Sequence, residues 1–253
     1  MSGKHTHTLS VHGHSPVHRL PPETKVAAHL VFVLAVVVTP RAQIWAFFVH
    51  GLLLVGVLSL SEIPLGFFIR RLGVEIPFVL FAVFLPFVGG GPEVTVAGVA
   101  MSQEGLWGAW NILAKATLGV GASVILVATT EVPHLLRGLD RLRVPRPITA
   151  IAGFMVRYLD VVVNEWGRMR TAMAARGYDP RWIGQIRALG TAGGALFIRS
   201  YERGERVYEA MLARGFDGRM PDIGSVRARP LDWTVGLSVS MCAWVIMLVA
   251  VAS

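Results

Sequence analysis

The chain lacks most features of an ordinary soluble enzyme. Only 16% of its 253 residues are charged, 53% are hydrophobic, and the mean hydropathy is +0.56. The only cysteine is Cys242 in an apolar run, so no disulfide can form within the chain and we expect a small buried side chain there. Neither a Gly-x-x-x-x-Gly-Lys-Ser/Thr phosphate loop nor a Gly-x-Ser-x-Gly elbow occurs. The composition therefore indicates a membrane protein without a P-loop ATPase site of its own.

Lysine is missing from residues 131–231, and acidic residues are in the minority there. The segment holds 17 Arg against 10 Asp or Glu, so it carries +7 of the total net charge of +8. Basic residues collect on the cytoplasmic side of membrane proteins. No recognition-helix, zinc-finger or RNA-binding signature accompanies this charge, so we expect no nucleic-acid partner. We predict that residues 131–231 lie in the cytoplasm.

Five apolar runs are candidate transmembrane helices, each of which needs about 20 residues to span a bilayer. They cover residues 26–38, 44–60, 74–88, 106–130 and 233–251. Arg70 and Arg71 indicate a polar turn before the third run, and Lys115 in the fourth either faces the protein interior or reaches an interface. With five spans, the positive-inside rule places the N-terminus in the cytoplasm and the C-terminus outside.

The N-terminal residues 1–25 form a polar leader without a cleavable signal peptide. Histidine-rich tracts can bind divalent metals. No cysteine or carboxylate completes a coordination sphere here, so we assign no metal site. The leader holds five of the eight histidines, namely His5, His7, His12, His14 and His18.

One stretch occurs twice at a constant offset of 38 residues. Residues 172–181 read Ala-Met-Ala-Ala-Arg-Gly-Tyr-Asp-Pro-Arg, and residues 210–219 read Ala-Met-Leu-Ala-Arg-Gly-Phe-Asp-Gly-Arg. Each copy follows an amphipathic helical pattern, and its glycine supplies the left-handed residue that ends a helix. An arginine in the last turn also offsets the helix dipole by roughly 0.3–1 kcal/mol. Because the flanks match in both copies, we predict that Arg176 and Arg214 are presented to a partner.

These residues resemble a known family. The paired Ala-Arg-Gly motifs, Phe154–Tyr158, Glu165 with Arg168-Met169, and the region of Lys25 are similar to the T component, EcfT or CbiQ, of energy-coupling factor transporters. The resemblance implies a subunit of an importer related to ABC transporters, without catalysis of its own. The run 199–206 and residues 102–130 look most like the cobalt branch, CbiQ, which implies cobalt uptake for cobalamin biosynthesis.

The resemblance also implies partners and site residues. In that family the two motifs end long coupling helices, and each arginine docks into a groove of one of two ATP-binding cassette ATPases. ATP and Mg²⁺ would be held by those ATPases, so no cofactor is expected in this chain. A cobalt-type substrate-capture membrane subunit and membrane lipid are the other partners, in the plasma membrane of a prokaryote. The implied ATPase-coupling interface consists of Ala175, Arg176, Gly177, Ala213, Arg214 and Gly215, with no catalytic and no metal residue.

Other functions stay open. The same component could serve nickel or a vitamin such as biotin. A membrane-embedded enzyme would need a site among His134, Glu131, Asp140 and Asp160. Asp140 and Asp160 each have an arginine within three positions, and we expect an ion pair between Arg157 and Asp160. A self-sufficient channel would need polar residues along several spans, and the first two spans offer few.

The expected fold is an all-α membrane protein with about five transmembrane helices plus a cytoplasmic layer of amphipathic coupling helices. We predict four segments: the leader (1–25), transmembrane helices 1–4 (26–130), the cytoplasmic coupling-helix domain (131–231) and a C-terminal transmembrane helix (232–253).

Overall fold

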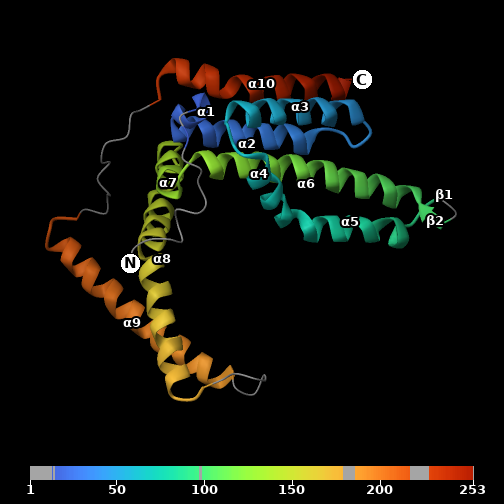
Figure 1. Ribbon diagram of the computed structural model, residues 1–253. Helices are drawn as coiled ribbons and strands as arrows, with labels where there is room; N and C mark the ends of the chain where they lie inside the picture. Colours follow the sequence, from blue (N-terminus) through green and yellow to red (C-terminus); the bar gives the residue numbers. More distant parts are fainter. Residues whose placement is uncertain (1–12, 14, 97–98, 179–185, 217–227, 253) are drawn as a thin grey trace. The chain divides into compact units, whose positions relative to one another are not determined.

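The computed structural model describes residues 13, 15–96, 99–178, 186–216 and 228–252, and most of them are helical (Figure 1). The all-α fold class is confirmed. The chain divides into two compact units. We call them the two-helix unit, which contains α8 (Arg146–Ala175) and α9 (Ile186–Leu212), and the bundle unit, which contains the other described elements.

The bundle unit consists of helices and one short hairpin. The hairpin pairs Glu93 with Ser102 and is antiparallel. Residues 93–96 alternate charged or polar side chains with valine, a pattern typical of a strand, although no strand was expected here. The elements are α1 (Pro16–Arg19), α2 (Pro22–Val38), α3 (Ile44–Leu60), α4 (Leu65–Leu72), the 3-10 turn η1 (Gly73–Glu75), α5 (Ile76–Val88), β1 (Glu93–Val96), β2 (Val99–Ser102), α6 (Gln103–Thr129), α7 (Val132–Arg141) and α10 (Pro230–Ala252).

Helix α2 is the centre of the bundle unit and packs against α10, α7 and α6. Ala35 and Val36 on its buried face are at most 1% exposed. They lie in one apolar cluster with side chains of α3, α6 and α10: Phe47, Leu118, Ala122, Ala243 and Met247. A second cluster holds α4 on α3 and α6, and includes Leu58, Phe68, Val124, Ile125 and Ala128.

Side-chain donors connect these helices through backbone carbonyl groups. Ser240 Oγ and Trp244 Nε1 of α10 donate to carbonyl oxygens of α2 at 2.7 and 3.0 Å. Lys115 Nζ of α6 donates to Val37 O at 2.7 Å, in the last turn of α2. Polar groups in a membrane protein need such internal partners because lipid offers none. Lys115 therefore faces a neighbouring helix and closes its C-terminal end.

Four described segments are long and apolar enough to cross a membrane. They are Leu65–Val88, Gln103–Thr129, Arg146–Ala175 and Pro230–Ala252; α3 is apolar but has only 17 residues. α8 meets this criterion by length and composition, although residues 131–231 are expected in the cytoplasm. Large apolar side chains of α3 and α5, such as Phe48 and Phe87, are more than half exposed, as expected for surface in contact with lipid.

Two local expectations were wrong. Arg70 and Arg71 belong to the last turn of α4, and the guanidinium carbon of Arg71 lies 4.5 Å from the centre of the Phe67 ring. The helix forms because Phe68 is buried against α6 while the arginines remain on the other faces. Cys242 is exposed, because α10 packs through the face that carries Ser240, Ala243 and Met247.

Candidate functional site

Helix α8 ends in a Schellman motif at the first Ala-Arg-Gly. The helix ends at Ala175, Arg176 follows, and Gly177 has a φ of +78°. The Gly177 N–H donates to the carbonyl three residues back at 3.0 Å, and the Tyr178 N–H donates to Met173 O at 3.1 Å. These bonds satisfy carbonyl groups that a helix end otherwise leaves without partners.

Helix α9 ends in the same way at the second Ala-Arg-Gly. Gly215 has a φ of +81°, and its N–H donates to the carbonyl three residues back at 2.9 Å. The Phe216 N–H donates to Met211 O at 3.0 Å, as Tyr178 does to Met173. The two helix ends therefore share one backbone geometry. The predicted glycine-terminated ends at residues 177 and 215 are confirmed.

This geometry explains the repeated residues beside the arginines. In a Schellman motif the residue after the glycine bonds to the carbonyl five positions earlier, and apolar side chains commonly fill both positions. These positions hold Met173 with Tyr178 in one copy and Met211 with Phe216 in the other. The Asp and Arg that complete each repeat lie outside the described residues.

Both arginines of the motifs are exposed, as are Ala175 and Ala213. Within the described part of the chain, Arg176 and Arg214 make no ion pair, whereas other arginines of α8 and α9 do. A Cβ built on Gly177 or Gly215 would meet no atom within 4 Å. The glycines are therefore needed for their positive φ and not for close packing. Each helix end presents a small, open surface with one guanidinium.

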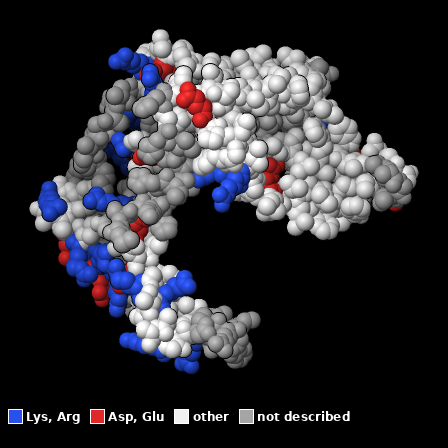
Figure 2. Space-filling view, in the orientation of Figure 1, with Lys and Arg blue, Asp and Glu red and all other residues white. Residues whose placement is uncertain are grey.

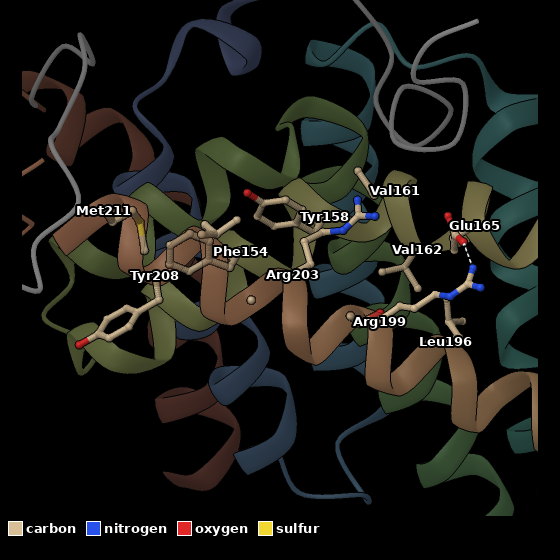
Figure 3. Close-up of a pocket in the computed structure, with 13 residues that line it drawn as sticks. Phe154, Tyr158, Val161, Val162, Glu165, Leu196, Arg199, Arg203, Tyr208 and Met211 are labelled. Carbon is tan, nitrogen blue, oxygen red and sulfur yellow. Dashed lines mark hydrogen bonds and ion pairs between the residues drawn. The ribbon is translucent and has the colours of Figure 1, made fainter. Parts of the chain in front are cut away.

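Helices α8 and α9 pack against each other in opposite directions. Phe154, early in α8, lies beside Tyr208 and Met211, late in α9, at one end of their contact (Figure 3). At the other end, Arg199 of α9 donates to Glu165 of α8 at 2.8 Å. Glu165 also accepts a hydrogen bond from Arg168, so one carboxylate pairs with two guanidinium groups. The contacts at these two ends show that α8 and α9 are antiparallel.

A groove of about 370 Å³ follows this contact. Its lining is mostly apolar: Val161 and Val162 lie between the two ends, and Leu196 lies beside the pair of Glu165 and Arg199 (Figure 3). On the face shown in Figure 2, Lys and Arg side chains gather over α8 and α9, whereas the helices of the bundle unit carry few charges there. The two-helix unit thus combines a basic surface with an apolar groove.

The antiparallel contact places the two arginines far apart. The C-terminal end of α9 lies near Phe154, whereas α8 continues for 21 residues beyond Phe154 to Ala175. At 1.5 Å per residue, that is roughly 30 Å of helix. Arg176 and Arg214 therefore stand at opposite ends of this pair of helices, and a single small ligand cannot contact both.

The other candidate residues do not form a site in the described part of the chain. No group of three or more His, Cys, Asp or Glu side chains there could hold a metal ion. His18 lies 2.6 Å from Ser15 Oγ, and the other four leader histidines lie outside the described residues. The expected ion pair between Arg157 and Asp160 is not among the pairs of the described residues, and Asp160 Oδ1 is buried without a described partner.

Two long-range contacts of the structure were not predicted from the sequence. Glu165 pairs with Arg199, 34 positions away, and Glu23 accepts a hydrogen bond from Arg141, 118 positions away. Neither pair has a local signal, because helical spacing rules apply only within about one turn. The resemblance included Glu165 with Arg168 and, separately, the run 199–206, but it gave no pairing between Glu165 and Arg199.

These features define a class: an all-α membrane protein with two helix ends of equal geometry, each carrying one exposed arginine. The sequence pattern of the family described as cobalt transport protein, CbiQ, matches residues 13–223. The chain therefore belongs to the CbiQ family, the transmembrane components of energy-coupling factor transporters.

Several relatives match over most of this chain and are named as transporter components. The energy-coupling factor transporter transmembrane protein EcfT of Bacillus subtilis is 28% identical over 95% of this chain and 94% of its own length. Those of Thermanaerovibrio acidaminovorans (30% identical, 87% of this chain and 84% of the relative) and Streptococcus thermophilus (27%, 91% and 91%) are similar. Their names describe transporter components rather than enzymes.

Proposed function

We propose that this chain is the coupling subunit of an energy-coupling factor importer. It would transmit ATP-driven motion of two partner ATPases to a membrane subunit that captures the substrate. The observation that carries the proposal is the pair of identical helix ends, each with an exposed arginine, at opposite ends of α8 and α9. The chain hydrolyses no ATP itself, and Mg-ATP belongs to the partner ATPases.

The shared geometry supports two docking events of one kind. Equal backbone shapes with equal charges fit equal pockets, so the two partners would be identical or closely similar ATP-binding cassette subunits. Their separation, roughly 30 Å along the helix, leaves room for one subunit at each end. An arginine that enters a groove lined by carboxylates forms a desolvated charge pair, and truncating one partner of such a pair costs about 2–5 kcal/mol.

The ATPases require α8 and α9 on the cytoplasmic side, because ATP is hydrolysed there. The 17 Arg of residues 131–231 support that side by the positive-inside rule, with the N-terminus also in the cytoplasm. The exposed apolar helices of the bundle unit face the lipid of a prokaryotic plasma membrane. Cobalt is the proposed substrate, supported by the description of the matching family and by residues 199–206 and 102–130.

Charge reversal at each helix end tests the docking role. The intact chain is purified in mild detergent with its native partners, together with Arg176→Glu, Arg214→Glu and the double variant. We expect each single variant to weaken retention of the ATPases and the double variant to abolish it. Arg170→Glu and Arg206→Glu are the controls, since these exposed arginines lie on the same helices but not at their ends. Arg206 lies 4.0 Å from Glu202, so Arg170→Glu is the better matched of the two.

The outcomes of the reversal separate docking from substrate choice. Full ATPase retention by the double variant would overturn the proposal. Loss of ATPases from the control variants as well would show that overall basic charge, and not the helix ends, holds them. Uptake of Co²⁺ and of Ni²⁺ by cells expressing the complex then distinguishes cobalt from nickel.

A further inference from the structure

The first turn of α2 contacts those segments through which the bundle unit is connected to the two-helix unit. The chain leaves the bundle unit through α6 and α7 and returns shortly before α10. Residues Pro22–Lys25, which we call the α2 junction, touch all three of these helices or their ends. Glu23, Thr24 and Lys25 are each at most 8% exposed. Charged side chains are seldom buried to this degree unless they are paired.

Lys25 holds the end of α6. Its Nζ donates to Thr129 O at 2.9 Å and to Thr130 Oγ1 at 3.2 Å, where α6 ends and the chain turns into α7. A third bond goes to His18 O at 3.2 Å. A lysine at the C-terminal end of a helix satisfies its free carbonyl groups and interacts favourably with its dipole. The beginning of α7 is thereby fixed to α2.

Glu23 holds both connections to the two-helix unit. Its Oε1 accepts from Arg141 Nη1 at 3.0 Å and from the Ala228 N–H at 2.9 Å. Arg141 is the last residue of α7, two positions before the two-helix unit begins, and Ala228 lies two positions before α10. Glu23 Oε2 is buried and accepts no hydrogen bond from a described residue. One carboxylate oxygen thus binds both the end of α7, where the chain leaves the bundle unit, and the residue at which the chain approaches α10.

The backbones around this carboxylate are in close contact. A Cβ on Gly138 of α7 would lie 2.9 Å from the carbonyl carbon of Pro22. A Cβ on Gly236 of α10 would lie 2.3 Å from Thr24 Cγ2. Both distances are shorter than real Cβ contacts, so a larger residue at either position would force Pro22 or Thr24 to shift. Close-packed interiors transmit displacement, so α7 and α10 cannot shift at this point without displacing α2.

We propose that Glu23 is a positioning residue through which motion of α8 and α9 reaches the bundle unit. This inference rests on the proposed function, because it assumes that ATPases move α8 and α9. The displacement would arrive at Arg141 and Ala228, and the shared carboxylate would pass both to the first turn of α2. From there it spreads to α10 and α6, against which α2 packs.

The test uses the full complex with both ATPases in lipid nanodiscs. Glu23→Gln keeps the shape and one acceptor oxygen but removes the charge. Hydrogen–deuterium exchange is followed with and without ATP, and Co²⁺ uptake per ATP hydrolysed is measured in proteoliposomes. Glu75→Gln is the matched control, since Glu75 is equally buried in the same unit and accepts from Thr117 Oγ1 at 2.5 Å, away from the α2 junction.

We expect Glu23→Gln to retain the ATPases and the ATP-dependent exchange changes in α8 and α9. The ATP-dependent changes in α2 and at the start of α10 should disappear, and uptake per ATP should fall by about fivefold or more. A merely structural defect would instead raise exchange in α2 equally with and without ATP. Glu75→Gln should behave like the unchanged protein.

Two results separate the two proposals. If Glu23→Gln leaves the ATP-dependent changes in α2 intact, or if Glu75→Gln abolishes them equally, this inference alone is overturned. If the unchanged chain fails to retain ATPases, the proposed function fails, and this inference with it. Should Glu23→Gln not fold, Arg141→Gln breaks the same ion pair from the side of α7 and leaves the Ala228 bond in place, so the ATP-dependent changes in α2 should shrink. Unchanged exchange in that variant would overturn this inference.

Discussion

Replacing Gly177 by alanine tests whether the shape of the helix end, and not only its charge, decides docking. Gly177 has a φ of +78°, and a Cβ there would meet nothing within 4 Å. The only penalty is then the left-handed backbone, which costs a residue with a Cβ about 1–2 kcal/mol. If the free helix end relaxes, docking must restore the strained form, and the penalty appears as lost affinity.

The Kd of the ATPase that binds at that end is therefore expected to rise about 5- to 30-fold. Asparagine occupies left-handed positions more readily than alanine does, so Gly177→Asn should lose less than Gly177→Ala. Gly167 of α8 provides a control, because alanine at this position should stabilise the helix instead of straining it. A Cβ there also meets nothing within 4 Å, but the position is inside the helix. Gly167→Ala should favour helix by up to about 1 kcal/mol.

The assay is biolayer interferometry of purified ATPase on the chain in nanodiscs. The order of Kd expected is unchanged protein and Gly167→Ala lowest, Gly177→Asn next and Gly177→Ala highest. Equal affinity of Gly177→Ala and the unchanged protein would refute the reasoning, because the positive φ would then be irrelevant to docking. If Gly167→Ala weakens ATPase binding equally, the affinity depends on the body of α8 and not on its end.

Two further perturbations address packing. Glu165→Gln removes the charge shared by Arg168 and Arg199, which are exposed, so the effect on stability should be small. The distance distribution between spin labels on α8 and α9 should broaden, and an unchanged distribution would contradict this. Ser240→Ala with Trp244→Phe removes two hydrogen bonds from α10 to α2 and should lower the free energy of unfolding by about 1 kcal/mol. SDS-induced unfolding followed by circular dichroism measures this change. An unchanged free energy of unfolding would mean that apolar packing alone holds α10.

The helix ends could be predicted because their signal is local. A Schellman motif is decided within six residues, by a glycine with an apolar residue on each side at fixed positions. The sequence therefore located both ends, although it did not explain the repeated methionine and aromatic residue. Those two became meaningful only when Tyr178 and Phe216 were seen to bond to Met173 and Met211.

Contacts between distant parts of the chain were not predictable in the same way. The rule for residues three apart on a helix favoured a pair of Arg157 with Asp160. The structure instead pairs Glu165 with Arg168, which obeys that rule, and with Arg199, which no local rule reaches. Glu23 likewise looked like one charge in a polar leader, yet tertiary packing buries it.

The extent of the repeat shows whether a whole helix is duplicated or only the surface at the end of a helix. Aligned at the offset of 38, the helices agree at Ala172 and Ala210 and beyond, but in the eight positions before that only Arg168 matches, with Arg206. A duplicated helix would be expected to keep the residue types of its packing face. Here the groove-lining positions coincide at the offset of 38 but their residue types do not, since Val161 aligns with Arg199 and Glu165 with Arg203. Similarity confined to the last turn and the cap follows instead if both ends meet the same kind of pocket. The repeat itself therefore supports two equal partners, without reference to any relative.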